Sequence, residues 1–299
     1  MKKSRTQARA HAIKPHAPAT LALALGLTLS NSPAHAAPLV RSAGGDATAA
    51  SILGARDAFR VDLGGGTVAG PNGSFGGLRR EINWDGVPAA FSAANTLPAN
   101  FFNVNSPRGA VFSTPGTGFA VSGATTDAGA GQPAAADFGN INPAYTATFG
   151  EFSAQRLFTA LGSDITEVTF FVPGTATPAT VSGFGAVFSD VDTFGSTSLE
   201  FFNDVNASLG TFNVPNGIVT SESLSFLGVS FTAGERIGRV RITSGSAALG
   251  AGVNDGGGTD LVVMDDFIFA APGAVPEPPA TLLGGIGLAA LLAWRKFVR

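Results

Sequence analysis

Short runs of Phe, Val and Thr, separated by Gly, Pro, Asn and Asp, make up most of the chain from Leu78 onward. Runs of this kind are typical of β-strands joined by turns. Residues 123–143 are poor in strand-forming residues and are expected to form a long surface loop. We predict strands near residues 78–84, 109–113, 117–122, 146–152, 165–172, 180–190, 197–203, 208–214, 222–231, 236–243 and 261–270. So many short strands predict an all-β fold, specifically a β-sandwich that is jelly-roll-like.

The alternation of apolar and polar positions assigns faces to some of these strands. Val240 and Ile242 are expected to face the core, whereas Arg239 and Arg241 face outward. By the same rule, one apolar face is expected to contain Leu227, Val229 and Phe231.

The segment before the first predicted strand has a helical pattern instead. Asp46 is expected to N-cap one short N-terminal helix, which stops at the glycine run 64–66. A short strand over residues 59–63 is the alternative. The apolar residues with helical spacing are Ile52, Ala55, Phe59 and Leu63.

The first 36 residues have the features of a secretory signal peptide. Basic residues without any acid precede an apolar segment over residues 21–29, which is too short to span a membrane permanently. Ala34 and Ala36 form an Ala-x-Ala cleavage site, so the mature chain is expected to begin at Ala37.

The C-terminal tail combines three features in sequence. Residues 280–294 form an uncharged apolar run, roughly 22 Å long as a helix. With its flanking residues this run just spans a thin bilayer, and cations after it but not before it place the C-terminus in the cytoplasm. A buried C-terminal helix of a soluble domain is the alternative. The run lies between Val275, Pro276, Glu277 and Pro278 on one side and Arg295, Lys296 and Arg299 on the other.

These three parts in this order resemble the PEP-CTERM sorting signal of Gram-negative bacteria. Residues 276–278 match its Pro-Glu-Pro motif, residues 280–294 its membrane helix, and residues 295–299 its basic cluster. The additional Pro279 and an interrupted basic cluster depart from the pattern. The resemblance implies export by the secretion machinery, cleavage by an exosortase in the inner membrane, and an association with exopolysaccharide and biofilm matrix.

The two signals set the expected domain organisation and location. We predict a signal peptide (residues 1–36), a helix with a Gly-rich lead-in (37–77), a β-sandwich domain (78–271) and a sorting tail (272–299), with residues 271–274 as a linker. The protein is expected first as an inner-membrane-anchored intermediate and then at the cell surface or outside the cell.

Composition narrows the function of the exported body. Eight of the 18 basic residues lie in the two signals, but only one of the 21 acidic residues does, so the body carries a net charge near −10. This charge argues against nucleic-acid binding. All histidines and lysines lie in the signals, and the chain has no cysteine. The body therefore lacks the groups for Ser-His-Asp or Cys-His catalysis, Lys Schiff bases, typical zinc sites and disulfides.

Four aspartates are candidate metal ligands. Asp190 and Asp192 point the same way at the end of one predicted strand, and Asp265 and Asp266 interrupt another. Acids in apolar strands are costly unless they are paired or bind a cation, and hard oxygen ligands suit a structural Ca²⁺. The alternative is exposure at strand ends or pairing with Arg236, Arg239 or Arg241. Three further polar residues either join this site or form a hairpin loop: Asn254, Asp255 and Asp260.

A second candidate site lies in the polar-aromatic stretch 79–86. Arg80, Asn83, Trp84 and Asp85 are possible ligand contacts, with the Trp84 ring stacking on a sugar. The alternative is a half-buried core tryptophan on the same face as Ile82.

Together these features predict an exported cell-surface or extracellular-matrix protein that interacts with exopolysaccharide without catalysis. The alternative is a carboxylate-dependent glycosidase acting on that polysaccharide. Such an enzyme needs two acids about 5–5.5 Å apart for retention or about 6.5–9.5 Å for inversion. No spacing in the sequence predicts such a pair.

Overall fold

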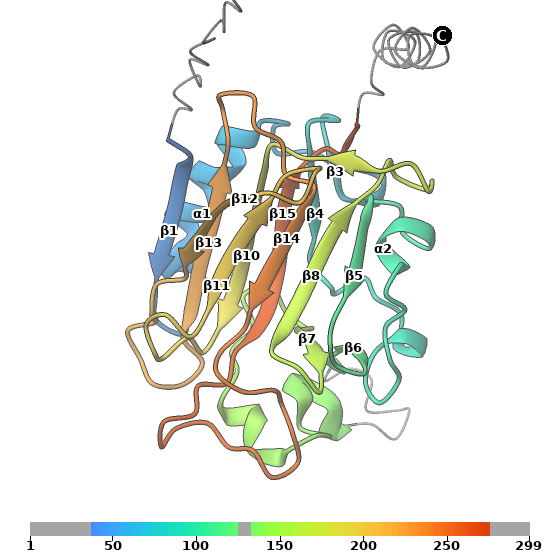
Figure 1. Cartoon of the computed structure of the whole chain (residues 1–299). Coiled ribbons are helices and arrows are strands. Elements are labelled where there is room, and N and C mark those ends of the chain that lie inside the picture. Colours follow the sequence, from blue (N-terminus) through green and yellow to red (C-terminus); the bar gives the residue numbers. More distant parts are fainter. Residues whose placement is uncertain (1–36, 125–132, 276–299) are drawn as a thin grey trace, which may run out of the picture. The chain divides into compact units, whose positions relative to one another are not determined.

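The computed structural model describes residues 37–124 and 133–275, which Figure 1 shows in colour. The chain divides into two units, Met1–His35 and Ala36–Arg299, and all described residues belong to the second. In this part of the chain no helix is both long and apolar enough to cross a membrane. The signal peptide and the C-terminal helix expected from the sequence lie outside the described residues.

The described domain is mostly β-structure, which confirms the all-β prediction. Its larger sheet is built from antiparallel pairs. In spatial order this sheet contains β1 (Leu39–Gly44), β13 (Leu224–Ser230), β10 (Gly183–Ser189), β15 (Val263–Ala270), β4 (Arg79–Ile82), β3 (Ser74–Phe75) and β2 (Ala69–Gly70), with β7 (Phe158–Leu161) beside β15 and β6 (Gly118–Val121) beside β7.

Two smaller sheets complete the β-structure. The first is antiparallel and contains, in spatial order, β12 (Ser208–Asn213), β11 (Ser198–Phe202), β14 (Arg239–Thr243), β8 (Ile165–Phe170) and β5 (Ala110–Ser113). The second pairs β9 (Ala179–Thr180) with β16 (Gly273–Ala274). The described α-helices are α1 (Ala50–Leu63) and the short α2 (Phe101–Val104).

The main core lies between the two large sheets, which overlap in Figure 1. Side chains from both sheets belong to one buried cluster, so the sheets pack face to face. In β14, Val240 and Ile242 are fully buried, while Arg239 and Arg241 on the other face pair with Glu167. The predicted alternation of this strand is confirmed. The same core contains, as predicted, Leu227, Val229 and Phe231.

Helix α1 covers the outer face of the larger sheet. Its Phe59 is fully buried and lies over two glycines that face each other across β10 and β13, Gly185 and Gly228. A Cβ atom at Gly228 would be 2.6 Å from the Phe59 ring, so only glycine allows this close contact. Because the helix covers this face, β10, β13 and β15 are buried on both sides, and their sequences are accordingly apolar almost throughout.

The predicted helix is confirmed, but its expected start is wrong. The helix begins at Ala50 rather than just after Asp46. The Asp46 carboxylate instead accepts a hydrogen bond from the Thr48 backbone N–H at 2.8 Å, which forms a turn ahead of the helix. The helix stops at Gly64 as expected, because the φ of 78° there is a left-handed conformation that favours glycine.

Segments that were expected at the margins of the sandwich are part of it. The lead-in 37–77 contributes β1, which pairs with β13 along its whole length, and α1, so the domain does not begin at residue 78. The expected linker 271–274 contributes β16. Residues 146–152 do not form a strand, because Asn142 caps a 3₁₀ turn over Pro143–Ala147. In the expected loop 123–143, the described part contains a 3₁₀ turn with a fully buried Phe138.

A β-bulge interrupts the pairing of β15 with β10. Met264 lies opposite Phe188 and Phe267 opposite Ala186, so Asp265 and Asp266 together face a single residue of β10. An extra residue of this kind changes the side-chain alternation of the strand. As a result both Met264 and Phe267 point into the main core.

Candidate functional site

Three aspartates from two different loops lie together beyond the end of β10. Asp190 and Asp192 follow β10, and Asp255 lies between β14 and β15. Each offers a carboxylate oxygen, and these oxygens all lie within 4.8 Å of one another. The sequence predicted Asp190 and Asp192 as metal ligands and left Asp255 open. None of the ion pairs between described residues includes any of the three.

Asp190 is the most constrained member of this aspartate cluster. Its side chain is fully buried, and neither carboxylate oxygen has a hydrogen-bond partner among the described residues. Burial, followed by the negative charges of its neighbours, first Asp192 and then Asp255, raises the pKa of Asp190 to about 8. Burial also raises the pKa of Asp192, to about 6, and that of Asp255. The cluster therefore holds negative charge at a high energetic cost.

Two polar side chains hold the loops around the cluster in place. Asp260 accepts hydrogen bonds from the backbone N–H groups of Asp192, at 3.1 Å, and Thr193, at 3.2 Å. Asn216, from the loop after β12, donates from Nδ2 to the backbone oxygen of Asp192 at 2.6 Å. Its Oδ1 is buried and has no hydrogen-bond partner in the described chain. Sequence reasoning missed Asn216, because no local pattern brings it close to Asp192.

Asp265 and Asp266 belong to a different environment. Both are buried, and the Asp265 carboxylate accepts hydrogen bonds from the backbone N–H groups of Phe152, at 2.8 Å, and Ser153, at 3.1 Å. The Ser153 hydroxyl donates to Asp266 at 3.1 Å. Burial, together with the charge of Asp266, raises the pKa of Asp265. Asp265 and Asp266 therefore do not share one calcium site with Asp190 and Asp192, contrary to the prediction from the sequence. The alternative for this pair, exposure at a strand end or pairing with Arg236, Arg239 or Arg241, is also wrong.

Trp84 is a core residue and has no free ring face. Its ring stacks on Phe158 with a centroid distance of 4.0 Å and is only 1% exposed. Its Nε1–H donates to the backbone oxygen of Asp265 at 2.7 Å. A ring buried in this way offers no surface to a sugar, so the sugar-stacking interpretation is wrong.

The neighbours of Trp84 make local contacts. Asp85 accepts hydrogen bonds from the backbone N–H groups of Gln155, at 2.7 Å, and Arg156, at 3.2 Å. Asn83 donates to Asp85 at 3.2 Å. Burial lowers the pKa of Arg80, which lies in β4. Asp85 therefore holds the turn after β4 against the 153–156 segment.

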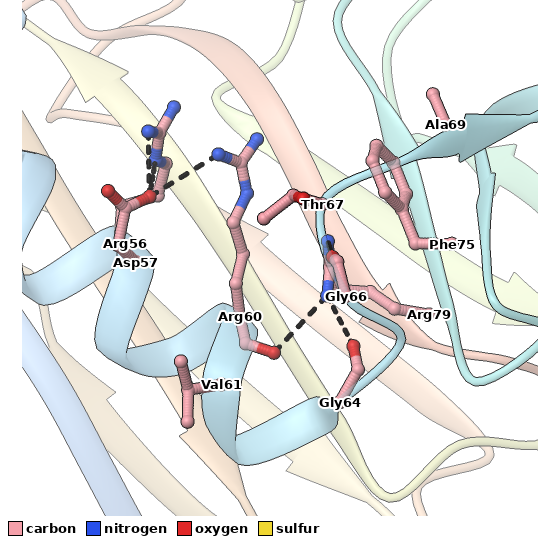
Figure 2. A pocket seen from close by; sticks show the side chains of 10 residues that line it. All are labelled: Arg56, Asp57, Arg60, Val61, Gly64, Gly66, Thr67, Ala69, Phe75 and Arg79. Carbon is pink, nitrogen blue, oxygen red and sulfur yellow. Dashed lines mark hydrogen bonds and ion pairs between the residues drawn. The ribbon is translucent and has the colours of Figure 1, made fainter.

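A pocket of about 760 Å³ lies between α1 and the glycine-rich segment that follows it (Figure 2). This volume is in the usual range for ligand sites, roughly 300–1,000 Å³. Three arginines lie along its wall, together with one acid and one aromatic ring: Arg56, Arg60, Arg79, Asp57 and Phe75. The sequence did not reveal this arginine pocket, because its arginines come from a helix and from a strand that the fold brings together.

Each arginine of this pocket is paired with an acid of the domain. Asp57 lies between Arg56 and Arg60 in Figure 2, at 2.7 Å and 3.3 Å from their guanidinium groups. Glu81 pairs with Arg60 and with Arg79, both at 2.6 Å. Arg79 is almost completely buried and also donates to backbone oxygens of the glycine-rich segment. Asp57 is the exposed member of the group, with 55% of its side chain accessible.

A pair of hydrogen-bonded carboxyl groups, Asp137 and Glu151, was not predicted from the sequence. Burial raises the pKa of Asp137 to about 6, and burial together with the charge of Asp137 raises the pKa of Glu151 to about 7.

Most residues of the predicted sorting and cleavage signals lie outside the described part of the chain. This applies to Ala34, Ala36, Pro276, Glu277, Pro278, Arg295, Lys296 and Arg299. Two residues at the limits are described: Ala37 is exposed, and the Val275 N–H donates to the Pro178 backbone oxygen at 3.3 Å.

Comparisons with known proteins give no match for this chain. No protein-family model matches it, and neither a curated protein nor a solved structure does. The function has to be argued from the residues themselves.

Proposed function

We propose that this protein is an exported, non-catalytic β-sandwich protein that an exosortase sorts, through the C-terminal tail, to the cell surface or the extracellular matrix. The observation that carries this proposal is the position of the folded domain along the chain. Its first strand starts at Leu39 and its last strand ends at Ala274. The domain thus fills the interval between the cleavage site expected before Ala37 and the motif that starts at Val275. A folded body between an export signal and a sorting signal is the expected layout of an exported cargo protein.

The end of the domain supports a transient membrane anchor. Residues 273–274 pair with β9, so no flexible linker separates the sandwich from the Val275–Pro278 motif. While the tail is intact, the helix expected over residues 280–294 holds the domain close to the inner membrane, and the basic residues 295–299 keep its end in the cytoplasm. Cleavage at the motif then releases the whole sandwich.

The order of the strands supports a jelly roll as the finer architecture. In a jelly roll, the first, eighth, third and sixth strands form one sheet, and the second, seventh, fourth and fifth form the other. Taking β4 as the first strand and β8 as the second, the two sheets here contain β4-β15-β10-β13 and β8-β14-β11-β12 in this order. β1 and β5 extend the two sheets at their edges. Lectin domains are among the proteins with this architecture, although a fold alone does not determine function.

We assign the contact with exopolysaccharide to the arginine pocket of Figure 2, with a preference for acidic sugar units. Asp57 is more than half exposed between Arg56 and Arg60, so the carboxylate of a ligand can take its place. Guanidinium groups bind carboxylates well because their paired N–H donors match the two oxygens. The exported body is otherwise strongly acidic, so an acidic polymer is attracted to this pocket and repelled elsewhere.

The sorting proposal is tested in the native host by exchanging single residues of the tail. Glu277→Gln is expected to leave the tail uncleaved, so that the protein accumulates in the inner-membrane fraction. Pro279→Ala, next to the motif but outside it, is the matched control and is expected to be processed like the unchanged protein. Fractionation and the mass of the released protein are the measurements. Accumulation of the unchanged protein in the cytoplasm with residues 1–36 still attached would refute the proposal.

A further inference from the structure

The aspartate cluster Asp190, Asp192 and Asp255 has more negative charge than its surroundings compensate. We propose that these three residues bind one calcium ion, with Asn216 Oδ1 as a fourth protein ligand. The ion then ties together the loops that follow β10, β12 and β14. This inference is independent of the sorting function proposed above.

Acids often gather at protein surfaces without any ion, so the cluster alone is not sufficient. The second observation is the state of Asp190: its side chain is fully buried, yet neither carboxylate oxygen has a hydrogen-bond partner among the described residues. A buried carboxylate without partners is among the costliest arrangements in a protein. One of its oxygens lies within 4.8 Å of one carboxylate oxygen from each of two further acids, where a cation between them satisfies all three.

The backbone at Asp190 also indicates a built site. The residue has a φ of 71°, a left-handed conformation that a non-glycine residue rarely adopts. Its N–H donates to the Ser223 backbone oxygen at 2.8 Å, which fixes this conformation. Strained residues of this kind persist only where the surrounding structure holds them, and they concentrate at functional sites.

The ligand chemistry favours calcium over other cations. All candidate ligands are oxygens, and the body has neither histidine nor cysteine for a softer metal. Calcium accepts six to eight oxygen ligands at about 2.3–2.6 Å in flexible geometry, so three carboxylates, an amide oxygen and water suit it. Magnesium requires a near-ideal octahedron and loses its water reluctantly, which loops from three separate segments do not favour.

Hydrogen bonds from neighbouring groups already orient the proposed ligands. The Leu261 N–H donates to Asp255 Oδ1 at 2.9 Å. Asp260 holds the backbone at Asp192, and Asn216 Nδ2 bonds the backbone oxygen of the same residue. Such outer contacts hold metal ligands in the correct orientation and are part of most metal sites.

The test uses the full-length protein, first stripped with EDTA. Thermal unfolding is followed without metal, with calcium chloride and with magnesium chloride, each at roughly 1 mM, where extracellular modules bind calcium. Calcium is expected to raise the Tm by about 3–6 °C and magnesium by much less. Calorimetric titration is expected to give about one calcium ion per chain.

Asp190→Asn separates binding from folding. It should abolish the calcium-dependent rise and, in EDTA, raise the Tm by about 2–5 °C, because it removes the cost of burying a carboxyl group next to two other acids. A variant that is only damaged in its fold has a lower Tm in EDTA. Asp192→Asn, at a less buried member of the cluster, should weaken calcium binding at least about tenfold. Asp204→Asn, at an exposed acid in another loop, is the control and should leave calcium binding unchanged.

Three results would overturn the proposal. The first is a Tm of the unchanged protein that is the same in EDTA and in calcium. The second is an equal response to magnesium, which refutes the assignment to calcium. The third is a calcium response that persists in both Asp190→Asn and Asp192→Asn, because the ion is then bound elsewhere.

Discussion

The arginine pocket and the aspartate cluster differ in whether their buried charges have partners of opposite charge. In the pocket, Arg60 and Arg79 are drawn into the domain, and each guanidinium lies 2.6 Å from the Glu81 carboxylate. In the cluster, Asp190 is fully buried, but its charged neighbours are other acids. Every arginine of the first region has an acidic partner within the chain, whereas the three aspartates of the second have no cationic partner among the described residues.

This difference indicates where the domain depends on something outside itself. A buried ion pair is costly to break but needs no further partner. A buried group of like charges has to take up protons or bind a cation. We therefore expect the contribution of the arginine pocket to stability not to depend on metal, whereas the contribution of the acidic end depends on metal and on pH.

The largest effect on stability is expected from breaking an ion pair in the arginine pocket. Arg79→Met leaves Glu81 with one guanidinium fewer and removes the donor to the backbone oxygens of Gly64 and Gly66. Removing one partner of a buried pair typically costs about 3–5 kcal/mol. Urea unfolding should show a correspondingly lower midpoint at an unchanged m-value.

The matched control is Arg41→Met, the same substitution in an ion pair with Asp62 whose arginine side chain is 38% exposed. Screening by water makes such a pair contribute little, so the urea midpoint should barely change. Equal losses in Arg79→Met and Arg41→Met would contradict the comparison, because burial would then not determine the value of the pair.

The sequence predicts those parts of the fold that depend on local pattern. Residues 239–243 alternate because only one face of their strand is covered. The helix ends after Leu63 because the next residue is a glycine in a left-handed conformation. β1 was missed because its half-exposed sequence has no clear alternation, and its pairing with β13 joins residues far apart in the chain. Residues 146–152 were wrongly assigned because the cap at Asn142 starts a turn where the composition favours a strand.

The candidate sites show the same limit. Asp190–Asp192 and Asp265–Asp266 look alike in the sequence, since both are pairs of acids in or beside apolar strands. What separates them is tertiary: Ser153 and the backbone next to it satisfy Asp265, while Asp190 is left without partners. The nearness of Asp255 and Asn216 likewise depends on loops that only the fold brings together.

A medium effect that depends on pH is expected at the Asp137–Glu151 pair. The pKa of Glu151 is raised to about 7, mainly by burial, so the folded protein holds a proton there that the unfolded chain releases at lower pH. The free energy of unfolding must therefore fall as the pH rises from about 4.5 to about 7. Glu151→Gln removes this loss and should stabilise the protein by about 1–2 kcal/mol at pH 8, allowing for partial exposure, with no gain near pH 4.

The measurement is urea unfolding of both proteins in EDTA at several pH values. Glu200→Gln is the control, because Glu200 lies 3.9 Å from Arg241 and has a cationic rather than an acidic neighbour. It should give no gain that grows with pH. A stability difference for Glu151→Gln that is the same at pH 4 and pH 8 would show that charge is not its cause.

The smallest effect on stability, and the most informative one for the ligand, is expected from Asp57→Asn. Asp57 is 55% exposed, so its loss should change the free energy of unfolding by no more than about 0.5 kcal/mol. It frees Arg56 and Arg60 from their internal carboxylate, so binding of polygalacturonate should tighten about three- to tenfold and weaken with salt. Arg56→Met should weaken the same binding, and neutral dextran should respond to neither variant. Unchanged or weaker polygalacturonate binding by Asp57→Asn would show that this compensated pocket is purely structural.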